Sequence, residues 1–242
     1  MGNDYQSAKQ SNMVIGMLGG MGSYATLHVF KKYLQKFKAE KEWQRPRMII
    51  DNNCTMPSRV RAILYHEEEE VLTNEIKSSI QNLINAGATD IFLACNTSHV
   101  FLERVSDHFQ NSNCKIHHII NECINYLEQQ KRHNVYLLAT EGTIQSGVFV
   151  NKKSNLEWAY SEDDFVLVRE FIESVKQNQI TPEIIDKFCE FVNSKKENTI
   201  VLGCTELPVL YDLCKDRITK LVVDPIDVVL DNLYRANLNQ QK

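Results

Sequence analysis

Two cysteines stand in matching contexts, one in each half of the chain, and thiols suit proton transfer. Cys95 follows the apolar run 91–94, and Cys204 follows the run 199–203. After each cysteine comes a polar segment containing threonine, and then the expected start of a helix. Unpaired N–H groups and the dipole at a helix N-terminus favour a thiolate. The two cysteines are therefore candidates for a pair that works together.

Two thiols that approach a bound molecule from opposite sides would invert a carbon stereocentre. One thiolate removes a proton from the carbon, and the other thiol returns a proton to the opposite face. The costly species is a carbanion next to a carboxylate, which fixed hydrogen-bond donors must stabilise as charge develops. Asn96, Thr97 and Thr205, together with loop N–H groups, are suitable donors.

The elements that must position these groups are buried strands. Short apolar runs such as those before the two cysteines are typical of a parallel sheet, and ligands bind at the carboxyl ends of its strands. Another strand, within residues 13–19, runs into a glycine-rich turn in which Gly20 and Met21 are candidates for substrate contact. The turn matches neither a dinucleotide fingerprint nor a P-loop.

A further strand, around residues 48–50, enters a loop rich in asparagine that ends at Arg59. Asn53 in this loop is a candidate substrate-binding residue. An arginine beyond a strand end can bind a carboxylate through two hydrogen bonds. Taken by itself, a solvated surface role for Arg59 remains the alternative.

The order of these segments repeats. In each half, a strand with a glycine-containing loop precedes the strand with the cysteine loop, which indicates a duplicated βα unit. The sequence therefore predicts an α/β fold of two pseudo-symmetric domains, each a small, mostly parallel sheet flanked by helices, with the active site in the cleft between them. We expect a flexible tail over 1–12, a first domain from 13–112 plus 221–242, and a second domain from 113–220.

Two expectations concern side chains away from the cysteines. The helix after the glycine-rich turn should place Leu27, Phe30, Leu34 and Phe37 on one buried face. The neighbouring His117 and His118 are interpreted as surface groups rather than ligands.

Composition restricts the classes of partner. The chain has 242 residues and a net charge of -4, so it lacks the basic footprint of a nucleic-acid-binding protein. Its apolar runs are too short to cross a bilayer, and its polar N-terminus lacks the apolar core of a signal peptide, so we expect a cytoplasmic protein. The seven cysteines have neither disulfide-framework nor zinc-site spacing, and we expect no metal site.

The motifs CNT (95–97), GCTEL (203–207), GMLGGMG (16–22) and ATEGT (139–143) resemble those of the aspartate/glutamate racemase family. The resemblance runs from about Met13 to the last helix. It implies an amino acid racemase that needs no cofactor, acts on a small-molecule substrate, an amino acid, and forms a homodimer. Cys95 and Cys204 would be the acid/base pair between two domains.

The resemblance also implies roles for residues around the pair. Asn96, Thr97 and Thr205 would hold the α-carboxylate region, and Thr140 and Thr143 would lie near the substrate. Glu206 would meet the ammonium group. Arg59 and Lys176 would recognise the side-chain carboxylate, which favours aspartate over glutamate. One departure is Ser23, where the family usually has proline.

Several alternatives stay open. One is a glutamate or broad-specificity racemase, and another is a hydantoin racemase, a maleate cis–trans isomerase or an arylmalonate decarboxylase. The isomerase would use one cysteine as a nucleophile and the decarboxylase needs one thiol, so two intact cysteines favour the racemase. A non-catalytic sensor of a dicarboxylate is the alternative from a different class. A pyridoxal phosphate enzyme would need a Schiff-base lysine, and nothing in the sequence marks one.

Overall fold

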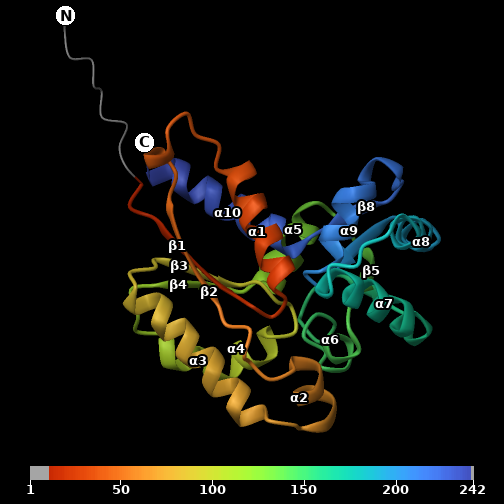
Figure 1. The fold of residues 1–242 in the computed structure, drawn as a ribbon, viewed down its shortest axis with the longest axis horizontal. Coiled ribbons are helices and arrows are strands. Elements are labelled where there is room, and N and C mark those ends of the chain that lie inside the picture. Colours follow the sequence, from red (N-terminus) through yellow and green to blue (C-terminus); the bar gives the residue numbers. More distant parts are fainter. Residues whose placement is uncertain (1–10, 241–242) are drawn as a thin grey trace, which may run out of the picture.

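The computed structural model describes residues 11–240, which form two parallel sheets of four strands each (Figure 1). The strand order is β2-β1-β3-β4 in the first sheet and β6-β5-β7-β8 in the second. The strands are β1 (Val14–Gly19), β2 (Arg47–Asn52), β3 (Asp90–Leu93), β4 (Lys115–His117), β5 (Asn134–Leu138), β6 (Glu157–Ala159), β7 (Thr199–Leu202) and β8 (Leu221–Val223). The same pairing order in both sheets confirms the predicted α/β fold and its internal repeat. Of the expected tail, residues 1–10 lie outside the described residues.

Ten α-helices connect and cover the strands in the described part of the chain. They are α1 (Ser23–Lys36), α2 (Arg59–Tyr65), α3 (Glu69–Asn85), α4 (His99–Val105), α5 (Ile119–Gln129), α6 (Glu141–Gln145), α7 (Phe165–Lys176), α8 (Pro182–Asn193), α9 (Leu207–Cys214) and α10 (Pro225–Gln240). Among residues 11–240, none of the helices combines the length and the apolar character that crossing a membrane requires.

The helices form layers on both sheets because the strands are apolar on both faces. Helices α3 and α4 cover one face of the first sheet, and α7, α8 and α9 cover one face of the second. The remaining faces share a central core with α1, α5 and α10. Along β1, for example, Met17 enters the central core while the next residue, Leu18, packs on the opposite face.

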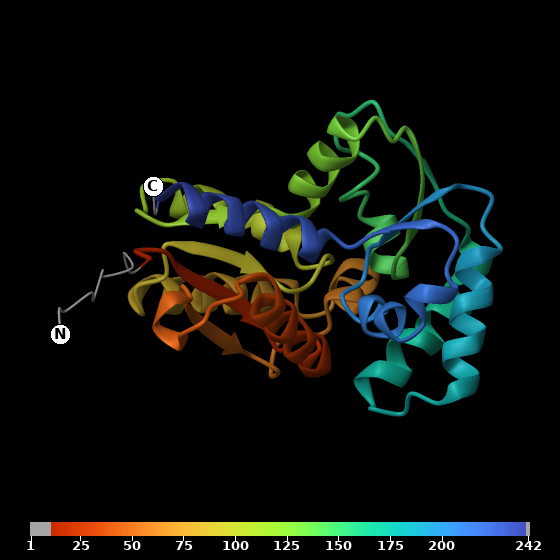
Figure 2. The ribbon, with the colours of Figure 1, turned by 90° about the horizontal axis from the view of Figure 1, so that it is seen from above.

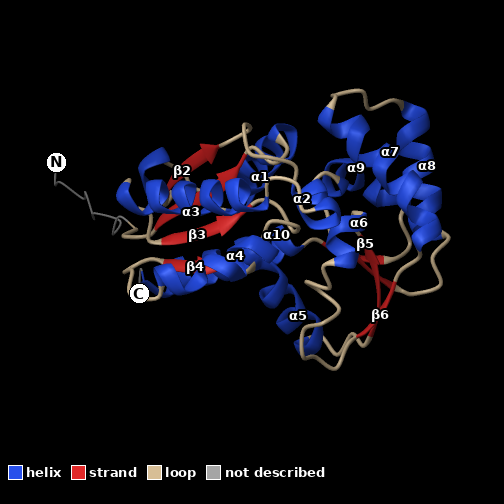
Figure 3. Ribbon diagram, turned by 90° about the horizontal axis from the view of Figure 1, so that it is seen from below, coloured by secondary structure: helices blue, strands red, loops and turns tan. Residues whose placement is uncertain are grey.

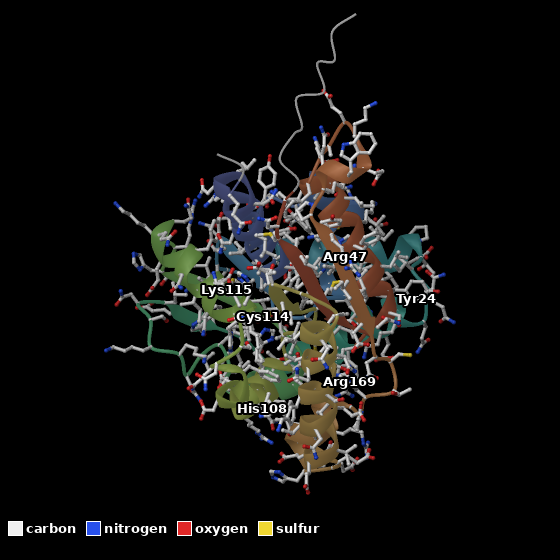
Figure 4. All side chains as sticks on the ribbon, turned by 90° about the vertical axis from the view of Figure 1, so that its left-hand side faces the viewer. Tyr24, Arg47, His108, Cys114, Lys115 and Arg169 are labelled. Carbon is white, nitrogen blue, oxygen red and sulfur yellow. The ribbon has the colours of Figure 1, made fainter. Side chains whose placement is uncertain are left out.

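The carboxyl ends of the first sheet's strands point toward the second half of the molecule, as the arrowheads in Figure 3 show. Arg47 and Lys115, at the amino ends of β2 and β4, are labelled on the side facing the viewer in Figure 4. The loops that follow β1 and β3 therefore lie toward the second half. This orientation puts the glycine-rich turn and the Cys95 loop where the second domain can contact them.

Two strand pairings move the expected domain boundaries. Strand β4 pairs with β3, so the first domain continues beyond residue 112. Strand β8 pairs with β7, so residues 221–223 belong to the second sheet rather than to the first domain. Both expected boundaries thus fall one strand too early. Helix α10 returns to pack on α1 and α5 (Figure 2).

Helix α1 buries only part of the face that its apolar residues predict, because Phe37 and Phe30 pack against the core but two leucines do not. Leu27 is 62% exposed and Leu34 is 38% exposed, whereas Lys32 is buried. The Lys32 ammonium donates to Asp224 Oδ2 at 2.7 Å and to Asp227 at 2.9 Å. A buried charge persists only when it is paired, and these two carboxylates provide the partners. The ion pairs join α1 to the start of α10.

The interpretation of His117 as a surface group is wrong. Its ring is buried, and its nitrogens contact Asp90 Oδ1 at 3.0 Å and Glu122 Oε1 at 2.6 Å. These hydrogen bonds to two carboxylates raise the pKa of His117, although burial opposes the charged form. The cluster ties β3 and β4 to α5.

Candidate active site

The two cysteine loops meet between the sheets. Cys95 follows β3 and Cys204 follows β7, each at the carboxyl end of its strand. The hydroxyl of Thr205 donates a hydrogen bond of 3.2 Å to the carbonyl oxygen of Ala94. Thr205 is the neighbour of one cysteine and Ala94 is the neighbour of the other. A single contact therefore links the two loops that the sequence predicts to work together.

Two side chains that the sequence reasoning missed hold the backbone of Cys95. Ser98 Oγ donates to the Cys95 carbonyl at 2.7 Å, and His99 Nδ1 lies 2.8 Å from the same oxygen. Because a carbonyl only accepts, Nδ1 carries the proton, and Nε2 is free to accept from the Ile119 N–H at 3.3 Å. Burial lowers the pKa of His99 to about 3, which keeps this ring neutral. The only signal in the sequence was the position of Ser98 and His99 directly after the CNT motif.

Three threonine hydroxyls join the halves beside Cys95. Thr97 Oγ1 lies 2.7 Å from Thr143 Oγ1 and 3.5 Å from Thr140 Oγ1. Thr140 and Thr143 are 2.9 Å apart, and Thr140 caps α6 by accepting from the Thr143 N–H. The structure thus brings together three of the predicted substrate-binding residues from both domains.

The side-chain amide of Asn96, next to Cys95, is buried without a hydrogen-bond partner among the described residues. The residue is only 1% exposed, yet neither Oδ1 nor Nδ2 has a partner among the described residues. A buried polar group without a hydrogen bond costs about 1–3 kcal/mol. The amide next to Cys95 is therefore suited to pair with a polar ligand.

Cys204 lies against the carboxylate of Glu206. The sulfur is 2.9 Å from Glu206 Oε2, with the thiol as the donor. Burial raises the pKa of Cys204 well above its usual range, and the Glu206 charge raises it further. The expectation that a helix N-terminus favours the thiolate is thus wrong for Cys204, because α9 begins only at Leu207 and the nearest charge is negative.

Glu206 also reaches across to the first domain. It is 2% exposed, and its Oε1 has no partner among the described residues. Gly22, at the start of α1, lies so close that a Cβ at this position would overlap Oε1. The glycine-rich turn, the Cys204 loop and the Cys95 loop therefore converge on one region.

Lys176 extends from the end of α7 toward the same region. Burial opposes its charge, but Glu206, Cys204 and Glu173 together raise the pKa of Lys176. Its ammonium lies 3.2 Å from Glu173 Oε1. Lys176 is thus a cation within electrostatic reach of the second thiol.

Arg59 and the loops of the first domain contact one another through backbone groups. The Arg59 guanidinium donates to the carbonyls of Met21 at 2.6 Å and Pro57 at 3.0 Å, which anchors α2 to the glycine-rich turn. Gly20, with a positive φ of 82°, packs against the backbone of Asn53.

The side chain of Asn53 is engaged elsewhere. Its amide donates to Glu75 Oε2 at 3.0 Å and to Ser79 Oγ at 3.1 Å, both on α3. In the structure, the side chain of Asn53 therefore ties the loop after β2 to α3.

A cavity of about 200 Å³ lies next to Thr140 and Lys176, between α2 of the first domain and α6 and α7 of the second. Thr140 and Lys176 form part of its wall, and Val60, Val168 and Ile172 supply apolar surface. Helices α2 and α6 approach closely here, because a Cβ on Gly142 would lie 3.1 Å from Val60 Cα.

Similar proteins agree with this architecture. The broad specificity amino-acid racemase RacX of Bacillus subtilis (strain 168) is 28% identical over 208 residues, which cover 82% of this chain and 88% of RacX. The Picrophilus torridus aspartate racemase superposes with a TM-score of 0.76 at 24% identity, over 95% of this chain and 94% of that one. Glutamate racemase from Francisella tularensis subsp. tularensis SCHU S4, in complex with D-glutamate, gives 0.67 at 15% identity, over 95% and 82%.

These two structural similarities establish the fold alone, since each identity is below a quarter. The family assignment comes from the sequence, in which residues 18–233 match the profile described as Asp/Glu/Hydantoin racemase. The match spans both cysteine loops, the strands β2 to β8 and the first part of α10. The chain therefore belongs to the Asp/Glu/Hydantoin racemase family.

Proposed function

We propose that this protein interconverts the enantiomers of an acidic amino acid, most favourably aspartate, by proton transfer between Cys95 and Cys204 and without a cofactor. Racemisation is an isomerisation, the class of reaction to which this family's racemases belong. The proposal adds the substrate, the two bases and the site residues to that general assignment.

The observation that carries the proposal is the hydrogen bond from Thr205 to the Ala94 carbonyl. It joins the residue after one cysteine to the residue before the other, so the two cysteine loops are in contact between the domains, which supports a shared site. Two acid/base groups on opposite faces of a carbon are what inversion without a cofactor needs. The unpaired amide of Asn96 and the cluster of threonine hydroxyls supply donors for the carboxylate.

An acidic substrate is supported by the cation at the second thiol. Lys176 lies within electrostatic reach of Cys204 and Glu206, and it forms part of the wall of the adjoining cavity. A carboxylate on the substrate's side chain would pair with this ammonium. Arg59 would act mainly by anchoring α2 and the glycine-rich turn, because two of its N–H groups already donate to carbonyls.

A broad-specificity racemase is the second candidate, and the cavity beside Lys176 favours it. The apolar surface of Val60, Val168 and Ile172 would accommodate side chains other than carboxylates. The relative RacX is named as a broad specificity amino-acid racemase. Comparison of aspartate, glutamate and neutral amino acids as substrates separates the two candidates.

The homodimer and the cytoplasmic location remain predictions from the resemblance and the composition. Size-exclusion chromatography with light scattering measures the first, and cell fractionation measures the second.

The test of the proposed function is replacement of each thiol. Cys95→Ser and Cys204→Ser should each reduce racemisation by at least about a thousandfold, because loss of one base removes proton transfer on one face. Chiral chromatography of L- and D-aspartate after incubation measures the rate. Full racemisation by Cys204→Ser would show that a second thiol is not required.

A further inference from the structure

The two thiols are not equivalent, because within residues 11–240 only Cys204 of this pair has a carboxylate against its sulfur. Glu206 Oε2 accepts from the Cys204 thiol at 2.9 Å, and both groups come from the same loop after β7. The Glu206 side chain is 2% exposed, so water does little to screen its charge. The contact is therefore a charge-assisted hydrogen bond in a dry setting.

Such a contact stabilises the thiol over the thiolate. A carboxylate accepts from S–H, but it repels a sulfur that has lost its proton. The groups that favour the thiolate are the backbone N–H of Glu206 and the ammonium of Lys176 on α7, and both act more weakly than Glu206 and burial. Glu173 partly neutralises that ammonium by pairing with it.

The position of Glu206 is fixed from the other domain as well. Its Oε1 lies against Gly22, whose φ of -146° is open to any residue, so position 22 needs a glycine for space alone. Any larger side chain there would displace the carboxylate. The first domain thereby leaves room for Glu206 to contact the sulfur.

We propose that Glu206 is a positioning residue that holds Cys204 in its thiol form, so that Cys204 begins the reaction as the proton donor and Cys95 as the proton acceptor. The donor assignment rests on the proposed racemisation. For the enantiomer whose α-hydrogen faces Cys95, the α-proton passes to the Cys95 thiolate, and the electron pair of the broken C–H bond remains on carbon. That pair takes the Cys204 proton on the opposite face, which leaves Cys204 as a thiolate. Cys204 regains a proton, and Cys95 loses one, through solvent after product release. The other enantiomer reacts by the reverse of these steps.

The experiment that tests this measures the thiol in the absence of substrate. Alkylation of the free protein by iodoacetamide across a pH series, with mass spectrometry of the peptide containing Cys204, gives the pH midpoint of thiolate formation. Glu206→Gln removes the negative charge at nearly constant shape and should lower the midpoint by at least about one pH unit, which is the usual effect of one nearby charge. Glu173→Gln is the matched control, because it removes a carboxylate that touches Lys176 but not the sulfur.

Gly22→Ala is a second test variant in case Glu206→Gln fails to fold. The added methyl group should push the Glu206 carboxylate away from the Cys204 sulfur. It changes neither thiol nor carboxylate, and it should shift the Cys204 midpoint in the same direction as Glu206→Gln. An unchanged or raised midpoint in both variants, with the melting temperature preserved, would overturn the proposal. An equal shift in Glu173→Gln would also overturn it, because the effect would then belong to the field of Lys176.

Exchange of the substrate's α-proton connects the thiol state to the reaction. In Cys95→Ser, Cys204 is the remaining thiol of the pair, and deuterium exchange at the α-carbon needs its thiolate. Addition of Glu206→Gln should move the pH dependence of that exchange downward by the same amount as the alkylation midpoint. If the alkylation shift appears but the wild-type protein racemises no amino acid, the proposed function fails while the pairing of Glu206 with Cys204 stands.

Discussion

Thr205 donates its side-chain hydroxyl to the backbone carbonyl of Ala94 at 3.2 Å, and this bond crosses from the second domain to the first. Thr205 directly follows Cys204, and Ala94 directly precedes Cys95. Thr97 and Thr143 form a second crossing at 2.7 Å. Side chains from the two cysteine motifs, Thr205 and Thr97, thus take part directly in the contact between the domains.

Removal of the Thr205 hydroxyl should impair activity more than folding. Thr205→Val keeps the shape but leaves the Ala94 carbonyl without this donor, at a cost of about 1 kcal/mol in stability. We expect the racemisation rate to fall about tenfold or more, because small errors in the placement of acid/base groups are costly. Thr205→Ser retains the hydroxyl and is the matched control. Equal rates for the valine and serine variants would contradict a positioning role for this bond.

Lys176 should govern the choice of substrate. In Lys176→Met, the aliphatic stem is kept and the charge is lost, so kcat/KM for aspartate should fall about a hundredfold, as for a lost charged hydrogen bond. Neutral amino acids should be affected far less. Lys187, which pairs with Glu170 on the surface, provides the control variant Lys187→Met. If aspartate and alanine lose activity equally, Lys176 acts on the thiol rather than on the substrate's side chain.

The neutral, buried His99 makes stability depend on pH. Its folded pKa is about 3, whereas an unfolded histidine titrates near 6.5, so the unfolded chain binds a proton that the folded one does not in this range. The stability from His99 is fully present above roughly pH 6.5 and falls as pH is lowered, by at most about 1.4 kcal/mol per pH unit.

Urea unfolding at several pH values measures this dependence, and His99→Gln should reduce the slope between roughly pH 6.5 and 5. The exposed His133 provides the control variant His133→Gln, which should leave the slope unchanged. His118, with a pKa lowered to about 4, contributes in the same direction and is retained in both variants. A slope identical in wild type and His99→Gln would show that the His99 ring does not stay neutral.

The sequence predicts the fold well where hydrophobic pattern and local turn chemistry agree. Thr181 and Pro182 mark the start of α8, and in the structure Thr181 caps that helix by accepting from the Ile184 N–H. The domain boundaries are harder to predict from the sequence, because short edge strands such as β4 and β8 differ little from loops in sequence. Only their pairing partners decide which sheet they join.

The hydrophobic pattern and the local motifs do not predict contacts between side chains that are far apart in the sequence. The buried Lys32 depends on carboxylates from the far end of the chain, and the buried His117 depends on Asp90 from another strand as well as on the nearby Glu122. The sequence around Lys32 gives no sign of its partners. The same holds within the site. The motifs identify Cys204 and Glu206, but only the structure brings Glu206 onto the sulfur and against Gly22.

The most direct test of the central claim is incubation of the purified protein with single enantiomers of aspartate in D₂O without added cofactor. Chiral analysis combined with mass spectrometry then reports inversion and isotope together. We expect each enantiomer to become racemic and the product to carry deuterium at the α-carbon, because each thiol exchanges its proton with solvent. Racemisation of a neutral amino acid alone would contradict the role of Lys176, and racemisation of glutamate alone would contradict the preference for aspartate. Absence of exchange with every amino acid would contradict the racemase reaction itself.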